Sequence, residues 1–350
     1  MGHDTAPSWP GVISELVAGR DLDRPSAEWA MDQIMAGEAS PVQVAGFLVG
    51  LRAKGESVEE MHGLAEQMLA HAHRLELPEP SLDIVGTGGD RAHTVNISTM
   101  AAMVVAAAGV LLVKHGNRAA SSSSGSADVL EALGVDLSLS PERVVEVAHE
   151  VGITFCFAQT FHPSMRHAAV ARRELGVGTA FNFLGPLTNP AQPTYAAVGC
   201  ADARMAPLLA GVFASRGKDA AVFRGDDGLD EVTVSTTTRV WWVRRGHITE
   251  RVIDPSRLGL GRHPIEALRG GDAVHNAGVV RQVFAGAAGA PRDAVLLNAA
   301  IALALTRPDS GDDQESFERD LRAAMERAAH TIDSGAAARL VDRWVAATRG

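Results

Sequence analysis

Residues 82–128 read LDIVGTGGDRAHTVNISTMAAMVVAAAGVLLVKHGNRAASSSSGSAD, and this stretch decides the fold. A short apolar run, 82–85, stops at the glycine-rich segment GTGGD, and the polar segment NIST then opens a helix of small residues. A second apolar run, 111–113, ends at KHGNR. Each of two strand ends therefore delivers a polar loop that contains glycine. In an open α/β sheet, ligands bind outside the carboxyl ends of the strands.

The residue types in these two loops suit a highly phosphorylated ligand. Glycines let the backbone approach a ligand closely, and N–H groups at the start of a helix favour anions. Hydroxyl groups, Lys114 and Arg118 supply further donors. GTGGD has neither the spacing of a Walker P-loop nor that of GxGxxG, so the pattern predicts an anion site of another kind.

Composition and charge exclude several classes of protein. The chain has 350 residues, of which 46% are hydrophobic and 21% charged, as in an ordinary globular protein with one large and one smaller domain. The formal net charge is −10, so no general basic field attracts nucleic acid or a membrane surface. A polyanionic ligand must therefore be held by local donors or by bridging metal ions.

Several features indicate a cytoplasmic protein. Cys156 and Cys200 lie in apolar contexts, which is typical of buried thiols in a reducing compartment. The N-terminus lacks the pattern of a signal peptide. The uncharged run 95–113 is interpreted as a buried helix followed by a strand, rather than as a membrane span, because a glycine splits it.

The order of apolar patterns predicts two domains. Residues 1–76 have helical periodicity, with Ser40 and Ser57 as N-caps, and we expect a helical domain that is joined by part of 163–190. In 77–350, short β-like runs alternate with helices, which favours an α/β domain with a mainly parallel sheet. The expected strands are 82–85, 111–113, 153–157, 196–199 and 220–223, the expected helices include 98–108, 141–151, 202–216, 291–306 and 334–348, and 231–253 is expected to form antiparallel strands around a turn at Arg245-Gly246.

Residues 225–231, GDDGLDE, gather four carboxylates directly after an expected strand. Hard cations such as Mg²⁺ bind carboxylate oxygens and often share their coordination shell with substrate phosphates. The alternative is a solvated turn. An acidic protein that binds a pyrophosphate would need such an ion, and we expect these loop carboxylates to be exposed.

Three arginines lie in the helix that follows residue 162. Arg166 and Arg173 are seven residues apart and share a face, whereas Arg172 points about 100° away from Arg173. We therefore expect two environments, one with solvent or a salt bridge and one suited to a carboxylate ligand. The pattern leaves open which arginine binds a ligand. His115 and His162 fit either acid–base groups or local structural roles.

These motifs together resemble the anthranilate phosphoribosyltransferase family over nearly the whole chain. The resemblance rests on FLVGLRAKGE at 47–56, on GTGGD, NIST and KHGNR, on GSAD at 125–128, on RRELG at 172–176, on FNFLGPLTNP at 181–190 and on GLDE at 228–231. It implies the fold of the pyrimidine nucleoside phosphorylases, in which a small helical domain is hinged to a large α/β domain with a mainly parallel central sheet. It also implies a homodimer formed through the helical parts.

The resemblance implies an activity in tryptophan biosynthesis, the second step from chorismate. The phosphoribosyl group of 5-phosphoribosyl 1-pyrophosphate (PRPP) would be transferred to the amine of anthranilate, giving N-(5-phosphoribosyl)anthranilate and pyrophosphate. Mg²⁺ is the implied cofactor, and neither nucleic acid nor a membrane is an expected partner. No acid–base residue or nucleophile is assigned, because an aromatic amine is already neutral near pH 7 and needs mainly to be positioned.

The family's site residues carry over by motif. Anthranilate would meet Gly86, Asn117 and Arg172, and Mg²⁺ would be held by Ser98, Asp230 and Glu231. PRPP would be bound by Gly86, Gly89, Asp90, Thr94, Asn96, Ile97, Ser98, Thr99, Lys114, His115, Gly116, Asn117, Arg118, Ala119, Ala120, Ser121, Ser122 and Ser126.

Departures from the family pattern and two alternatives accompany this reading. Ser123 stands where many relatives have lysine, and Ala119-Ala120 replace a commoner Ser-Val, so PRPP affinity is expected to be altered. A nucleoside phosphorylase of the same fold is disfavoured because KHGNR and GLDE are of the transferase type. A non-catalytic relative that binds nucleic acid is disfavoured by the Asp230-Glu231 pair and by the acidic chain.

Overall fold

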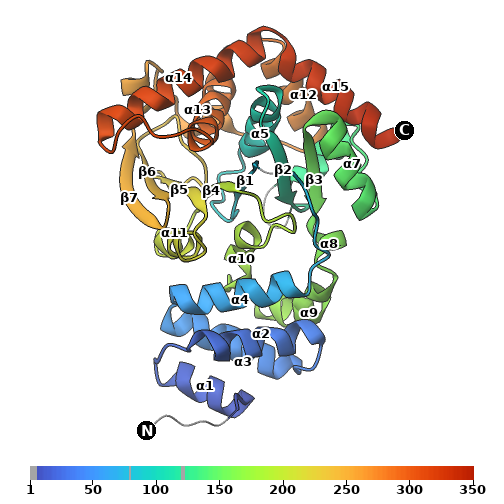
Figure 1. Cartoon of the computed structure of the whole chain (residues 1–350), viewed down its shortest axis with the longest axis vertical. Coiled ribbons are helices and arrows are strands. Elements are labelled where there is room, and N and C mark those ends of the chain that lie inside the picture. The colour runs from blue at the N-terminus through green and yellow to red at the C-terminus, as the bar shows by residue number, and fades with distance from the viewer. Residues whose placement is uncertain (1–5, 79, 120–122) are drawn as a thin grey trace. The chain divides into compact units, whose positions relative to one another are not determined.

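The chain folds into two compact units in a computed structural model that describes residues 6–78, 80–119 and 123–350. The helical unit contains the described part of 1–74 together with 159–190. The α/β unit contains the described parts of 75–158 and 191–350. Figure 1 shows the two units and the course of the chain through them.

The helical unit combines the N-terminal helices with the shorter helical elements of 159–190. Its elements are α1 (Trp9–Val17), α2 (Arg24–Ala36), α3 (Pro41–Lys54), α4 (Val58–Ala70), η1 (Pro163–Met165), α9 (Arg166–Leu175), α10 (Phe181–Leu184) and η2 (Gly185–Leu187), and α8 (Ala158–Phe161) begins where the chain enters this unit for the second time. Ser40 and Ser57 both form the predicted capping boxes, with Gln43 and Glu60 respectively. The helix α2 packs along α4, and α1 packs on α3.

A seven-stranded sheet forms the centre of the α/β unit, in the order β3-β2-β1-β4-β5-β6-β7. The strands are β1 (Ser81–Gly86), β2 (Leu111–Gly116), β3 (Ile153–Phe157), β4 (Tyr195–Gly199), β5 (Asp219–Gly225), β6 (Thr238–Arg244) and β7 (His247–Ile253). The first five strands are parallel, and β6 and β7 are antiparallel. The predicted mainly parallel sheet is thus confirmed.

The expectation of strands throughout 231–253 is wrong for its first part. Strand pairing starts at Thr238, and 231–237 form a loop. The reason is local hydrogen bonding: the Oγ1 of Thr233 donates to Oδ2 of Asp227 at 2.6 Å, which competes with a strand ladder. The predicted turn at Arg245-Gly246 is confirmed, and both residues have the positive φ that a tight hairpin requires.

Helices cover both faces of the sheet. They are α5 (Ile97–Ala107), α6 (Ser126–Leu133), α7 (Pro141–Val151), α11 (Met205–Ser215), α12 (Ala273–Phe284), α13 (Ala290–Leu305), α14 (Gln314–Asp333) and α15 (Ala336–Arg349), with the short turns η3 (Pro255–Leu258) and η4 (Ile265–Leu268). The helices α5 and α13 pack on each other and on the central strands, and α14 packs along α13 (Figure 1). On β5, Phe223 joins the core beneath these helices, whereas the neighbouring Val222 belongs to the face that α11 covers.

The uncharged run 95–113 forms α5 and β2, as predicted. The side chains of α5 are buried in the core of the α/β unit, for example Met100 and Val104, which are both 0% exposed. Within the described residues, no helix combines the length and the apolar character that are needed to cross a membrane.

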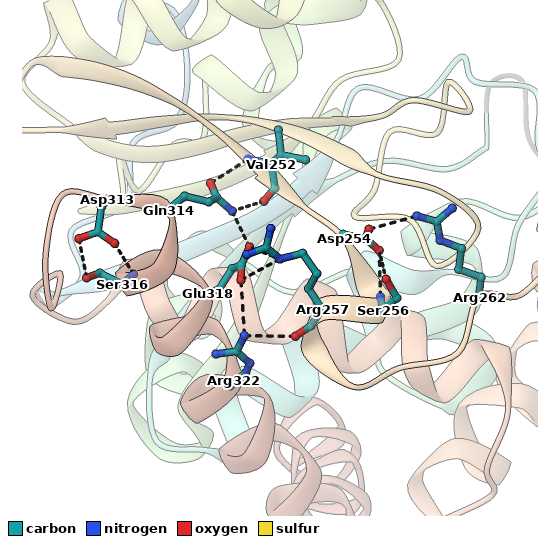
Figure 2. A network of polar contacts seen from close by, with 10 residues as sticks. All are labelled: Val252, Asp254, Ser256, Arg257, Arg262, Asp313, Gln314, Ser316, Glu318 and Arg322. Atoms are coloured by element: carbon teal, nitrogen blue, oxygen red, sulfur yellow. Dashed lines mark hydrogen bonds and ion pairs between the residues drawn. The ribbon is translucent and has the colours of Figure 1, made fainter.

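A polar network joins the edge strand β7 to α14 (Figure 2). The side chain of Gln314 occupies both main-chain groups of Val252: its Oε1 accepts from the Val252 N–H at 3.3 Å, and its Nε2 donates to the Val252 carbonyl at 2.6 Å. Glu318 is 3% exposed and pairs with Arg257 at 3.0 Å and Arg322 at 3.4 Å. Because the Gln314 amide bonds the outward-facing N–H and carbonyl of Val252, this part of β7 is not free to pair with another strand.

His162 has a structural role in the helical unit. Its side chain is 3% exposed, and Nε2 donates to the carbonyl oxygen of Thr188 at 2.9 Å. Burial lowers the pKa of His162 from 6.5 to about 4, because the charged form loses its hydration. Of the two roles that the sequence left open, this geometry fits the structural one.

His162 generates a prediction about stability and pH. The imidazole of His162 becomes protonated near pH 6.5 in the unfolded chain but only near pH 4 in the folded chain, because its pKa is lowered in the folded state. The contribution of neutral His162 to the free energy of unfolding is present above pH 6.5. It is lost as pH falls toward 4, by up to roughly 3 kcal/mol. We expect the free energy of unfolding of wild type, relative to His162→Gln, to fall over this range in urea titrations. A constant difference from pH 7 to pH 4 would contradict the assignment.

Candidate functional site

The carboxyl ends of β1 and β4 define the candidate site. These strands are parallel neighbours, but the chain continues from β1 to β2 and from β4 to β5, which lie on opposite sides of the pair. Connections that diverge in this way open a crevice at a topological switch point. GTGGD and NIST follow β1, and Gly199 ends β4.

Asp230 lies against the ends of both strands. Its Oδ2 accepts a hydrogen bond from the N–H of Gly88 at 2.7 Å. A Cβ added to Gly86 would lie 2.4 Å from Oδ2 of Asp230, and one added to Gly199 would lie 1.7 Å from its carbonyl oxygen. Both positions must therefore be glycine for Asp230 to occupy this place. The sequence analysis missed Gly199, although a glycine at the carboxyl end of an expected strand was a usable signal.

Glu231 reaches the start of α5. Its Oε1 accepts from the N–H of Ser98 at 3.1 Å, and a carboxylate is favoured at the positive end of a helix dipole. The next residue is held from the other side, because Asn298 bonds the N–H and the carbonyl of Val232, each at 2.9 Å. The segment that carries Asp230 and Glu231 is thus fixed at both ends.

The predicted exposure of the acidic loop is wrong for the two residues that matter most. Asp230 and Glu231 are each 8% exposed. The other two carboxylates serve the loop itself: Asp227 accepts from the Thr233 hydroxyl, and Asp226 accepts from the Thr237 hydroxyl. Long-range packing by Asn298 and the strand-end glycines, which local sequence does not reveal, buries the Asp-Glu pair.

The electrostatics of this pair favour a bound cation. Burial raises the pKa of Asp230 and the pKa of Glu231, repulsion from Asp90 raises both further, and the charge of Asp230 adds to the rise for Glu231. A divalent cation would relieve this repulsion. Within the described residues there is no cluster of three or more His, Cys, Asp or Glu side chains suited to a metal. Two carboxylates and the Ser98 hydroxyl nevertheless fit Mg²⁺, which keeps several waters and binds substrate phosphates.

The ammonium group of Lys114 lies close to Glu231 and to the start of α5. Its side chain is 2% exposed, and Nζ donates to the carbonyl of Ile84 and, at 3.4 Å, to Oγ of Ser98. Burial lowers the pKa of Lys114, whereas the charges of Asp83 and Glu231 oppose this shift. The ammonium group is thus bonded to protein groups, which does not support the expectation that it donates directly to a ligand phosphate.

The remaining predicted PRPP residues lie in three segments of the α/β unit. Gly86 ends β1, and Gly89 and Asp90 belong to the loop after it. Thr94 and Asn96 precede α5, which begins with Ile97, Ser98 and Thr99. The third segment comprises Lys114, His115 and Gly116 at the end of β2, Asn117, Arg118 and Ala119 after it, and Ser126 at the start of α6. The side chains of Ile97 and Thr99 are 0% and 1% exposed, so a ligand would meet mainly their backbone. His115 is 4% exposed, and its main-chain N–H donates to Oδ1 of Asp83 at 3.2 Å.

Asp128 closes the base of the loop between β2 and α6. Its Oδ2 accepts from the N–H of Ala119 at 2.9 Å and from the N–H of Gly125 at 2.8 Å. Arg118 turns toward α6 and pairs with Asp128 at 3.2 Å and with Glu131. The predicted residues Ala120, Ser121 and Ser122 lie outside the described residues, and Ser123 is exposed.

The three arginines have the two environments that were predicted. Arg172 is partly buried, its guanidinium lies 5.1 Å from the centre of the Phe181 ring, and burial lowers its pKa. No carboxylate of the described residues pairs with it. Arg166 and Arg173 are exposed. Arg172 is thus a stacked, partly desolvated guanidinium that lacks an anionic partner within the described part of the chain, and it belongs to the helical unit.

The close approach at Gly199 can be tested by its effect on stability. In Gly199→Ala, the new Cβ must displace the backbone of Asp230, and forced packing of this kind costs about 1–3 kcal/mol. We expect urea unfolding to show this loss. Gly261→Ala is the matched control, because nothing lies near its Cβ, and its effect should stay within about 0.5 kcal/mol. Equal stabilities of the two variants would refute the contact.

Comparisons with known proteins agree with this geometry. Residues 78–338 match the profile of the glycosyl transferase family, a/b domain, and residues 10–72 match its helical bundle domain. The anthranilate phosphoribosyltransferase of Nocardioides sp. is 61% identical over 97% of this chain and 99% of its own length.

Two solved structures extend the comparison to the fold. The anthranilate phosphoribosyltransferase of Thermus thermophilus is 41% identical, with a TM-score of 0.88 over 97% of this chain and 99% of that one. The enzyme of the same name from Saccharomyces cerevisiae, in complex with PRPP and Mg, is 26% identical, with a TM-score of 0.87 over 97% of this chain and 98% of that one. The chain therefore belongs to the anthranilate phosphoribosyltransferase family of glycosyl transferases.

Proposed function

We propose that this protein transfers the phosphoribosyl group of PRPP to the amine of anthranilate, giving N-(5-phosphoribosyl)anthranilate and pyrophosphate in tryptophan biosynthesis. The observation that carries the proposal is the buried Asp230–Glu231 pair at the switch point, beside the two glycine-bearing loops. The full-length likeness to transferases of this name supports the choice of substrates.

The proposed site binds a polyanion through its own polar groups. Backbone N–H groups of the loop after β1 and of the loop between β2 and α6 would bind the phosphates, because glycines there allow close approach. Asp230, Glu231 and Ser98 would hold Mg²⁺. When bound, this ion supplies positive charge that neutralises the pyrophosphate leaving group. Lys114 would support the site indirectly. Its ammonium group donates to the Ser98 hydroxyl, and its positive charge lowers the pKa of Glu231.

The acceptor needs orientation rather than activation. Breaking the bond between C1 and pyrophosphate leaves positive charge on the ribosyl ring, and the neutral aromatic amine then attacks C1. The planar guanidinium of Arg172, stacked on Phe181, would bind the anthranilate carboxylate through two parallel hydrogen bonds. By the family motifs, Gly86 and Asn117 would also contact anthranilate. The nitrogen that has attacked C1 is then positively charged and strongly acidic, and it loses a proton to water or to the released pyrophosphate. No general base is therefore required, which agrees with the structural role of His162.

The assembly and setting of the protein are part of the proposal. We infer a homodimer through the helical unit, because Val42 and Val49 of α3 are 81% and 45% exposed and lie seven residues apart on one face. Residues 1–76, with part of 163–190, would act as one domain and 77–350 as the other. A cytoplasmic setting suits the buried thiols of Cys156 and Cys200, whose pKa values burial raises.

The activity is tested by release of pyrophosphate from PRPP. We expect release that depends on both Mg²⁺ and anthranilate, with a product that carries the phosphoribosyl group on nitrogen. Thymidine with phosphate serves as the comparison, because it is the reaction of the related phosphorylases. Turnover of thymidine without turnover of anthranilate would refute the proposal.

The metal assignment predicts opposite effects on activity and stability. Asp230→Asn combined with Glu231→Gln should lower kcat by roughly 10²–10³-fold, as for other losses of charge stabilisation in a transition state. The free energy of unfolding should stay equal or rise, because neutral amides remove the repulsion that raises both carboxyl pKa values. Activity that remains near wild type at low Mg²⁺ would disprove the assignment.

The acceptor assignment predicts a difference between adjacent arginines. Arg172→Ala should raise the KM for anthranilate by roughly tenfold or more and lower kcat through misorientation, while the KM for PRPP stays near wild type. Arg173→Ala, on the exposed face, is the matched control and should change neither constant by more than about twofold. Similar kinetics in the two variants would rule out this acceptor site.

A further inference from the structure

We infer that Asn276, a residue outside every motif of the predicted site, is a positioning residue for the two PRPP-binding segments. The inference rests on the proposed function for its kinetic consequence, but the geometry stands independently. Asn276 lies in the first turn of α12 and is 2% exposed. Its side chain contacts Asn96, which directly precedes α5.

Two side-chain amides form a continuous chain of hydrogen bonds. The Oδ1 of Asn276 accepts from the N–H of Gly271 at 2.9 Å, and its Nδ2 donates to Oδ1 of Asn96 at 2.8 Å. The Nδ2 of Asn96 in turn donates to the carbonyl of Ser124 at 3.0 Å. The chain therefore joins three separate segments: the loop before α12, the start of α5, and the end of the loop between β2 and α6.

The main chain holds Asn276 in register with its partner. The N–H of Val95 donates to the carbonyl of Leu268 at 2.9 Å, and the N–H of Gly270 donates to the carbonyl of His93 at 2.8 Å. A Cβ on Gly270 would lie 2.8 Å from the carbonyl oxygen of Thr94, so the two backbones are closely packed. His93 has a positive φ of 51°, a conformation that surrounding contacts must stabilise.

Both segments that Asn276 ties together are needed for the proposed phosphate site. One of them begins α5, where the N–H of Ser98 holds Glu231 at 3.1 Å. The other ends at Ser124, next to Gly125, whose N–H is bound by Asp128 at 2.8 Å. A ligand that contacts both segments benefits when their spacing is set before it binds, because less freedom is lost on binding.

The order of donors and acceptors in this chain of hydrogen bonds cannot be reversed. Gly271 offers a donor at one end and Ser124 offers an acceptor at the other, so each amide has one allowed orientation. In Asn276→Asp, the contact to Gly271 is kept, but an oxygen then faces Oδ1 of Asn96. If the Asn96 amide turns over, its oxygen faces the Ser124 carbonyl instead. This substitution breaks the chain without changing the size of the side chain.

The experiment compares the steady-state kinetics of Asn276→Asp with those of Thr348→Val. Thr348 is the matched control: it is 5% exposed in α15, and its hydroxyl accepts from the N–H of Asp136 at 3.1 Å, away from both segments. We expect Asn276→Asp to raise the KM for PRPP by about tenfold, as for one lost buried hydrogen bond. The KM for anthranilate and kcat should stay within about threefold of wild type, and the control should change no KM.

Hydrogen exchange of a peptide that spans 123–133 provides a readout that needs no substrate. Exchange should be faster in Asn276→Asp than in wild type and unchanged in Thr348→Val, because release of Ser124 loosens the residues that lead into α6. If Asn276→Asp does not fold, Asn276→Ser removes the amide without adding charge and should change both readouts in the same direction.

The outcomes separate the inference from the proposed function. Wild type that shows no transfer to anthranilate would refute the function, and the exchange comparison would still decide the role of Asn276. In an active enzyme, a KM for PRPP that is unchanged in Asn276→Asp overturns the inference. Equal effects of the 276 and 348 variants on KM or on exchange also overturn it, because they indicate a general loss of stability.

Discussion

The burial of two adjacent carboxylates at a topological switch point is the constraint on which the rest of the site depends. Gly86 and Gly199 leave room for Asp230, and the backbone N–H groups of Gly88 and Ser98 bind oxygens of Asp230 and Glu231 respectively. Burial removes water from each charged carboxylate and raises the pKa of both groups, and repulsion from neighbouring carboxylates raises the pKa values further. A divalent cation would relieve this electrostatic repulsion, and the arrangement is therefore suited to one.

Three buried polar side chains, those of Lys114, Asn298 and Asn276, contact the segments that form the site. Lys114 contacts the Ile84 carbonyl of β1 and the Ser98 hydroxyl, and its charge lowers the pKa of Glu231 and so opposes the effect of burial. Asn298 and Asn276 are buried amides that satisfy backbone or side-chain partners in segments far along the chain. Fully bonded amides of this kind rigidify loops, because any other arrangement would leave a buried polar group without a partner.

The two compact units carry different parts of the proposed chemistry. The segments suited to phosphates and to Mg²⁺ belong to the α/β unit, where parallel strands end in glycine-bearing loops. The guanidinium suited to the acceptor, Arg172, belongs to the helical unit, where Phe181 supports it. A transfer between two small substrates requires that donor and acceptor be positioned for attack, and each unit supplies polar groups suited to one of them.

The sequence by itself determined the helix caps at Ser40 and Ser57, the parallel strands, the hairpin turn and the family, because each depends on residues that are close together in the chain or on ordered motifs. Only the tertiary structure decided that Asp230 and Glu231 are buried, that Lys114 contacts Ser98, that Gly199 closely approaches Asp230 and that Asn276 bonds to Asn96. These features arise from contacts between distant residues: Gly88 and Asp230 are 142 positions apart, and Asn96 and Asn276 are 180 apart. Local patterns carry no information about such contacts, since packing of the whole sheet and its helices creates them.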